Sequence, residues 1–185
     1  MLNYIINWFS TLGNIGPVML NKIVNNNYDK KRESYYKMYS IYSPISFISD
    51  CHFIIDNIYL GSSYNASNKL LLEYYEIKSI VNATANIPNF FENEIDYFNI
   101  NINDNGEDIF TKENLENSYN FICSQPTNVL VHCVFGRSRS ATIVLYYLIR
   151  KYKYTIEEAL LFLKNKRYYI NPSITFINNL KNIIN

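Results

Sequence analysis

The segment from residue 129 to residue 151 limits the fold of this chain more than any other. Residues 129–131 form a short, fully apolar run of the kind found in the buried strands of a parallel sheet. A loop with one glycine, Gly136, follows, and residues 140–151 form an apolar run with the length of a helix. A buried strand that leads through a short loop into a buried helix predicts a layered α/β domain.

The chain after residue 50 continues this alternation of strands and helices. We expect strands at residues 53–55, 58–60, 77–81, 95–100 and 129–131, with Gly61 ending the first pair. We expect helices at residues 66–75, 111–123, 140–151 and 156–166, and a last helix that opens at Asn171 and Pro172. Thr155 and Glu158 have the spacing of a capping box for the fourth helix. The pattern predicts a central, mostly parallel sheet of about five strands flanked by helices.

Length and charge narrow the classes of function. The chain has 185 residues, enough for one domain of ordinary size with an extension. Seventeen Lys and Arg residues nearly balance sixteen Asp and Glu residues. This balance gives no large basic field, so nucleic acid is not an expected partner.

Three cysteines, Cys51, Cys123 and Cys133, lack the paired spacing of a disulfide framework or of a zinc site. They fit a reducing compartment, and we expect the cytoplasm or the nucleus. Cys51 and Cys123 are predicted to be core residues rather than redox partners. His52 is predicted to be a strand residue.

The first 24 residues are apolar but make a poor signal peptide and a poor membrane span, because no basic start precedes them and glycines and a proline interrupt them. We expect a helix that packs on the domain or on a twin subunit, which would make a homodimer; contact with a membrane surface is the alternative. Residues 1–45 are therefore assigned to an N-terminal helical extension of unknown role, and residues 46–185 to the main domain.

The loop after the apolar strand has the features of an anion-binding site. Its backbone N–H groups can converge on one point, and the following helix adds its positive end to the same point. Arg139 comes six residues after Cys133, and its planar fork can grip two phosphate oxygens. The same positive field lowers the pKa of the Cys133 thiol and favours a nucleophilic thiolate.

The order His-Cys, five residues, Arg-Ser at residues 132–140 resembles the signature loop of the cysteine-dependent protein tyrosine phosphatases, and residues 136–142 resemble the dual-specificity branch. Residues 56–62 are similar to the opening strand pair of that family, and residues 81–84 to its Asn-x-Thr segment. Residues 167–180 resemble its closing helix. The resemblance extends from about residue 46 to residue 185 and implies a cysteine-phosphatase-like fold.

The resemblance also implies roles for the loop and its neighbours. Cys133 is the expected nucleophile and Ser140 the donor to its sulfur. His132 is expected to orient the loop, and Asn82 to support it. The phosphate-binding residues implied by the resemblance are Val134, Phe135, Gly136, Arg137, Ser138 and Arg139.

The general acid of the family is an aspartate on a loop about 30 residues before the cysteine. Asp104 lies 29 residues before Cys133 and soon after the strand at 95–100, so we expect it to be the acid. Asp108 is the alternative. An acid is required because an alkoxide or phenolate leaves poorly unless it is protonated as it departs.

Two loop residues depart from the family pattern. Phe135 stands where a small residue is usual, and it would shape the wall of the pocket. Arg137 adds a cation that would attract substrates with further negative charge, or else simply faces solvent. A mitochondrial lipid-phosphatase branch has the same Gly-Arg-Ser-Arg-Ser sequence, so a lipid substrate stays an alternative.

The resemblance implies an enzyme that removes phosphate from tyrosine and from serine or threonine of proteins through a phosphocysteine intermediate, without a metal or another cofactor. Its expected partners are phosphoprotein substrates. A phosphatase for phosphoinositides or for RNA 5′-phosphates is the alternative among enzymes. A phosphate-binding module that has lost catalysis is the alternative outside them.

Overall fold

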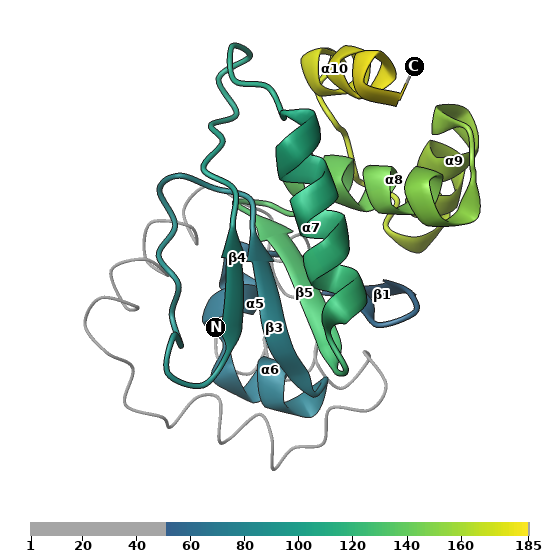
Figure 1. The fold of residues 1–185 in the computed structure, drawn as a ribbon. Coiled ribbons are helices and arrows are strands. Elements are labelled where there is room, and N and C mark those ends of the chain that lie inside the picture. Colours follow the sequence, from purple (N-terminus) through teal and green to yellow (C-terminus); the bar gives the residue numbers. More distant parts are fainter. Residues whose placement is uncertain (1–50, 185) are drawn as a thin grey trace, which may run out of the picture. The chain divides into compact units, whose positions relative to one another are not determined.

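The computed structural model describes residues 51–184 (Figure 1). The predicted N-terminal helix, the extension to residue 45 and the dimer predicted through it lie outside the described residues. The domain boundary near residue 45 stays a prediction. Within residues 51–184 no helix is both long and apolar enough to cross a lipid bilayer.

The described residues form an α/β domain around one sheet of five strands, as the sequence predicts. The strands are β1 (His52–Ile55), β2 (Ile58–Ser62), β3 (Ile77–Asn82), β4 (Asp96–Asn99) and β5 (Asn128–Cys133). Their order in the sheet is β1-β2-β5-β3-β4. Only β1 is antiparallel to its neighbour, and the other three pairs are parallel. The prediction of a mostly parallel sheet is confirmed.

Strand β2 is longer than predicted, because Gly61 lies inside it. Gly61 pairs with His132, and Ser62 pairs with Cys133, so pairing with β5 extends the strand beyond the glycine. A Cβ atom on Gly61 would come within 2.9 Å of the Leu130 side chain and 2.8 Å of Asn65 Oδ1. The glycine therefore permits close packing within the strand and does not end it.

Six helices are described: α5 (Ser63–Ser67), α6 (Lys69–Tyr74), α7 (Lys112–Ser124), α8 (Arg139–Tyr152), α9 (Ile156–Lys166) and α10 (Ile174–Ile184). The predicted helix at 66–75 is in fact divided at Asn68, whose side chain accepts a hydrogen bond from the Leu71 amide and so starts α6. The predicted capping box of α9 is confirmed: Thr155 and Glu158 exchange two hydrogen bonds.

The last helix begins later than predicted. Asn171 does not cap it, because α10 starts only at Ile174; the Asn171 amide donates to the carbonyl of Arg137, at 2.8 Å. The hydroxyl of Ser173 accepts a hydrogen bond from the Phe176 amide and so caps the N-terminus of α10. Residues 167–173 thereby become an irregular segment that runs beside the loop after β5.

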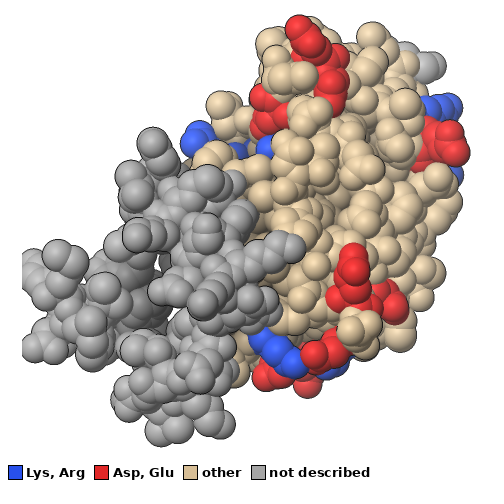
Figure 2. Space-filling model, turned by 90° about the vertical axis from the view of Figure 1, so that its left-hand side faces the viewer, with Lys and Arg blue, Asp and Glu red and all other residues tan. Residues whose placement is uncertain are grey.

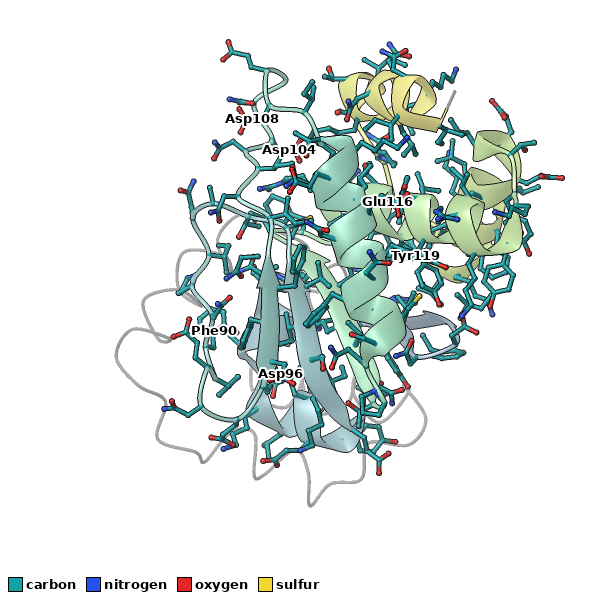
Figure 3. The ribbon with its side chains drawn as sticks, in the orientation of Figure 1. Phe90, Asp96, Asp104, Asp108, Glu116 and Tyr119 are labelled. Carbon is teal, nitrogen blue, oxygen red and sulfur yellow. The ribbon has the colours of Figure 1, made fainter. Side chains whose placement is uncertain are left out.

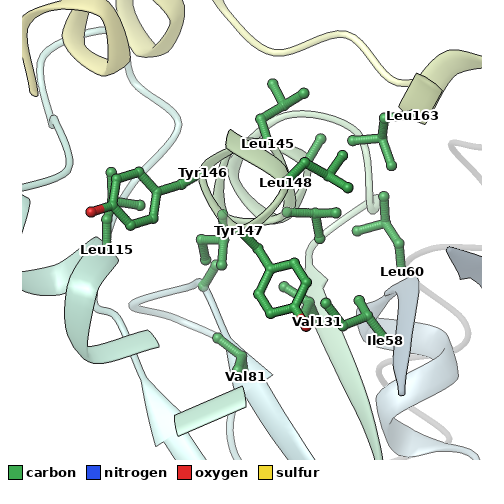
Figure 4. Packing of buried hydrophobic residues seen from close by; sticks show 14 of the residues in the cluster. Ile58, Leu60, Val81, Leu115, Val131, Leu145, Tyr146, Tyr147, Leu148 and Leu163 are labelled. Carbon is green, nitrogen blue, oxygen red and sulfur yellow. The ribbon is translucent and has the colours of Figure 1, made fainter. Parts of the chain in front are cut away.

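Helix α8 is the centre of the larger core. Every residue from Arg139 to Ile149 is buried, as expected of a helix covered on all sides. Val129 and Val131 of β5 face the cluster around α8, while Leu130 faces a second cluster on the α5–α6 side. This alternation is the period of two of a strand between two layers. Figure 4 shows Leu145, Leu148, Ile58 and Val131 packed in the larger cluster.

The prediction for two cysteines holds for one of them. Cys51 is buried in the smaller cluster, whereas Cys123 is exposed in the last turn of α7. The buried positions of α7 include Leu115, Ser118 and Ile122, which share one face of the helix. Cys123 follows Ile122 directly and is therefore turned about 100° away from that face.

Two leucines test how far α8 supports the fold. Leu145→Ala removes a fully buried side chain, and we expect it to lower the free energy of unfolding by about 2–5 kcal/mol. Leu161→Ala on α9 makes the same chemical change at a side chain that is 64% exposed, and we expect a change within about 0.5 kcal/mol. Urea denaturation followed by circular dichroism measures both. Similar losses for the two variants would show that α8 is not the centre of the core.

Candidate functional site

The candidate site lies where β5 ends and α8 begins, at the carboxyl edge of the parallel strands. Open α/β sheets bind their ligands at this edge. Cys133 is the last residue of β5 and Arg139 the first of α8, so residues 133–139 form one loop between them, here called the signature loop. The side chains of Cys133, Arg139 and Ser140 are all buried. The structure thus brings together the predicted nucleophile Cys133, the predicted phosphate-binding Arg139 and Ser140, the predicted hydrogen-bond donor to the sulfur.

The signature loop is held on one side by the segment after β2. The amide and the hydroxyl of Ser63 both donate to the carbonyl of Val134, at 3.2 and 3.0 Å. Gly136 adopts a φ of +67°, which a side chain would strain. A Cβ atom at this position would also collide with the carbonyl of Gly61 and lie 2.7 Å from Arg167 Nη2. Both its backbone angle and its surroundings therefore require glycine here.

Residues 167–173 hold the signature loop on the other side. Three consecutive loop residues each accept one hydrogen bond from this segment. The bonds run from Arg167 Nε to the Gly136 carbonyl (3.0 Å), from the Asn171 amide to the Arg137 carbonyl (2.8 Å) and from the Ser173 amide to the Ser138 hydroxyl (3.3 Å). Because these loop carbonyls point outward to their partners, the loop amides can point toward the centre of the loop, where an anion would bind.

Arg167 is the functional-site residue that sequence reasoning missed. It is fully buried. Its guanidinium carbon lies 4.4 Å from the centre of the Tyr169 ring, and its Nη1 lies 2.6 Å from Nδ1 of His52. His52 is at the start of β1, as predicted. A cation just after the last turn of a helix is normally interpreted as a solvated partner of the helix dipole. Hydropathy gives no signal that this one is enclosed.

The surroundings of the Cys133 thiol act on its pKa in two directions. Burial raises the pKa, but the nearby Arg139 guanidinium, the Ser140 hydroxyl and the amides of Ser140 and Arg137 lower it by more. The net pKa lies below the ordinary value of a thiol. Ser140 Oγ lies 3.3 Å from the sulfur. The arrangement favours a thiolate, which is the reactive form of cysteine.

His132 is buried directly before the nucleophile. Burial lowers its pKa to about 4, and the Arg139 charge acts in the same direction, against a weaker effect of its contact with the Cys133 carbonyl. Nδ1 lies 3.2 Å from that carbonyl oxygen. The imidazole is therefore neutral near pH 7. A neutral imidazole suits the predicted role of orienting the loop by hydrogen bonds.

Asn82 lies at the end of β3, opposite His132 of β5. Its side-chain amide donates to the Ile87 carbonyl at 2.8 Å and to Asn89 Oδ1 at 3.1 Å, and its oxygen accepts from the Thr84 hydroxyl at 2.7 Å. These bonds order residues 82–89 rather than the signature loop. A supporting role of Asn82 toward the loop stays a prediction.

The two candidate acids occupy the same loop between β4 and α7 but face different partners (Figure 3). Asp104 Oδ1 lies 3.4 Å from the Ser138 hydroxyl, and Oδ2 lies 3.5 Å from Arg139 Nε. Asp108 instead accepts from the amide and side chain of Asn103, at 2.8 and 3.0 Å. The amide of Asn103 is the first cause of the lowered pKa of Asp108. Asp104 therefore faces the signature loop, while Asp108 closes its own loop.

The two departures from the family pattern lie at the surface of the signature loop. Phe135 is 40% exposed although Gly136 directly after it is buried, so its ring is at the outer side of the loop. Arg137 Nε donates to the Tyr169 carbonyl at 3.1 Å. Arg137 thus takes part in attaching the loop to the 167–173 segment. Its predicted attraction for anionic substrates stays a prediction.

On the face shown in Figure 2, acidic and basic side chains form small separate groups among uncharged residues. Within residues 51–184, no cluster of three or more His, Cys, Asp or Glu side chains has the arrangement of a metal site. A pocket of about 510 Å³ lies away from the signature loop, between α7, α8 and α10. Its lining contains no residue of the loop.

The family described as "Dual specificity phosphatase, catalytic domain" matches residues 58–185. The chain belongs to the dual-specificity phosphatase family. Dual specificity protein phosphatase 1 of Homo sapiens is 40% identical over 131 residues, which are 69% of this chain and 35% of that protein. Protein phosphatase Slingshot of Drosophila melanogaster is 34% identical over 131 residues, 69% of this chain and 12% of that protein. The chain thus matches about a third or less of the length of these relatives.

Several solved structures share the fold. Human DUSP28 superposes with a TM-score of 0.67 at 20% identity, over 72% of this chain and 91% of that chain. PTPMT1 in complex with PI(5)P superposes with a TM-score of 0.59 at 23% identity, over 72% and 94%. At these identities the likeness concerns the fold alone. The predicted family and fold class are confirmed.

Two glycines with positive φ provide a matched test of the signature loop. Gly136→Ala adds the strain of a left-handed residue and a collision with Gly61, and we expect it to lower the free energy of unfolding by about 2–5 kcal/mol. We also expect its affinity for tungstate, a phosphate mimic, to fall by more than about tenfold, since the loop must shift by part of an ångström. Gly106→Ala has a φ of +84° but nothing within 4 Å, so it should cost about 1–2 kcal/mol and leave tungstate binding unchanged. Equal effects of the two variants on tungstate binding would refute the importance of the close approach to Gly61.

Proposed function

We propose that this chain is a protein phosphatase that hydrolyses phosphate esters of tyrosine and of serine or threonine. The observation that carries the proposal is a buried thiol beside a buried guanidinium. Arg139 Nε is buried, and among residues 51–184 it makes no hydrogen bond; the nearest acceptor is Asp104 Oδ2, at the ion-pair distance of 3.5 Å. A buried donor without a partner is rare, and a bound phosphate oxygen would satisfy it.

In the first step, the Cys133 thiolate attacks phosphorus from the side opposite the leaving oxygen. The S–P bond forms as the P–O bond breaks, and Asp104 gives its proton to the departing oxygen. The loop amides and Arg139 bind the other phosphate oxygens, where negative charge is greatest. The products of this step are the free hydroxyl of the substrate and a phosphocysteine.

In the second step, water attacks the phosphorus of the phosphocysteine. Asp104, now a carboxylate, takes a proton from the water, and the S–P bond breaks to release inorganic phosphate. Cys133 leaves as a thiolate, and a hydrogen bond from the Ser140 hydroxyl stabilises it. The 3.3 Å distance between Ser140 Oγ and the sulfur supports this role.

The relatives support a protein substrate, because two of them are named as protein phosphatases. One fold neighbour is described with a phosphoinositide and another as a phosphatase-like interacting protein. A lipid phosphatase and a silent binding module are therefore the alternatives that the test must separate. An RNA 5′-phosphatase is the third.

A turnover panel with phosphotyrosine peptides, phosphothreonine peptides, phosphoinositides and 5′-triphosphate RNA tests the proposal. We expect the peptides to react fastest, and a preference for lipid or RNA by orders of magnitude would contradict a protein substrate. Cys133→Ser should abolish turnover and keep tungstate affinity within about threefold, because the loop amides and Arg139 remain. Wild-type protein that binds tungstate but turns over nothing would indicate a silent binding module.

A pair of aspartate variants tests the assignment of the acid. Asp104→Asn should slow aryl phosphates with poor leaving groups by about 10²–10³, and those with good leaving groups much less, because only the former need a proton. Asp108→Asn is the matched control, since it changes the same atoms in the same loop. It should reduce stability and leave the dependence on the leaving group unchanged. The opposite result would move the acid to Asp108.

A further inference from the structure

Ser138 is the N-cap of α8, but its side chain does not act as a cap. A serine at this position usually turns its hydroxyl toward the first amides of its own helix. Here the hydroxyl makes no such bond, and the backbone carbonyl of Ser138 alone receives the Thr142 amide and hydroxyl. The hydroxyl of Ser138 is directed elsewhere.

The hydroxyl lies between two groups from distant parts of the chain. The Ser173 amide is 3.3 Å from Ser138 Oγ, and Asp104 Oδ1 is 3.4 Å from it. An amide can only donate, and a carboxylate can only accept. The proton of the hydroxyl is therefore directed to Asp104, and Ser138 connects the 167–173 segment to the acid loop.

This contact fixes one of the two carboxylate oxygens of Asp104, and Arg139 faces the other at 3.5 Å. The side chain of Asp104 is 37% exposed, so solvent would otherwise leave it several rotamers. When phosphate occupies the guanidinium of Arg139, the Ser138 hydroxyl is the contact that remains. A general acid must stay within hydrogen-bond reach of the oxygen that it protonates.

We propose that Ser138 is a positioning residue whose hydroxyl holds the carboxyl group of Asp104 over the signature loop, in reach of the leaving oxygen. This inference rests on the proposed phosphatase function and adds a side-chain role to a residue that otherwise contributes a backbone amide. It makes the hydroxyl, rather than the size of the side chain, the feature that matters.

Two substitutions separate the hydroxyl from the side chain. Ser138→Ala should lower kcat about tenfold for aryl phosphates with poor leaving groups and less than twofold for those with good ones, since part of the 10²–10⁴ of acid catalysis is lost. Ser138→Thr keeps the hydroxyl and should stay within about threefold of wild type on both. Tungstate affinity should change less than twofold in each variant. A loss that is equal for all leaving groups, or a threonine variant as slow as the alanine variant, would overturn the role.

A double-mutant cycle shows whether Ser138 acts through Asp104. In the Asp104→Asn background, adding Ser138→Ala should slow poor leaving groups by less than about twofold, because the acid that it positions is already absent. A further tenfold loss in that background would show that Ser138 acts on the phosphate or on the loop instead.

Amide hydrogen exchange gives a readout that does not depend on turnover. Peptides that cover residues 103–109 should exchange about three- to tenfold faster in Ser138→Ala than in wild type, the effect of losing one ordinary hydrogen bond, and Ser138→Thr should match wild type. If wild type turns over no substrate, the proposed function fails, and this comparison still decides the contact. Unchanged exchange in Ser138→Ala would refute it.

Discussion

The close approach of two backbone segments at Gly61 and Gly136 is the constraint on which the site depends. Gly61 lies inside β2, and its carbonyl occupies the space that a side chain on Gly136 would need. This contact sets how deeply the signature loop lies against the end of the sheet. Because the loop amides point inward only when the loop keeps this path, the anion site is a consequence of packing between the end of β2 and the signature loop, and not of the loop alone.

Fixing such a loop needs outward bonds for its carbonyls, and these come from both sides. Ser63 binds Val134, and the 167–173 segment binds Gly136, Arg137 and Ser138. The same residues delay the start of α10 to Ile174. The irregular segment therefore has a function: its backbone path places the Asn171 amide against the Arg137 carbonyl and so gives that loop carbonyl a partner.

Local sequence patterns were enough to predict the strand, loop and helix around Cys133 and the cap at Thr155, because each depends on neighbours within a few residues. The parallel sheet followed from the alternation of strands and helices along the chain. The enclosure of Arg167 could not be predicted in this way, since it depends on a partner 31 residues away. The break at Asn68 was missed for a different reason: its bond to the Leu71 amide is local, but the helical pattern around it gave no sign that the side chain would start a new helix. Asn is common throughout this sequence, which weakens it as a turn signal.

The pKa of the buried Cys133 thiol results from opposing effects of burial and of the positive groups around it. Burial of Cys133 by itself favours the uncharged thiol, and it also keeps water from the sulfur. Arg139, the Ser140 hydroxyl and the amides of Ser140 and Arg137 together outweigh the first effect without weakening the second. The Arg139 guanidinium is buried beside the thiol, and its Nη1 is held by the Ile102 carbonyl at 3.0 Å. That bond joins the clamp to the loop that carries Asp104. The same arginine thus favours the thiolate and binds the acid loop, so the two parts of the site cannot vary independently of each other.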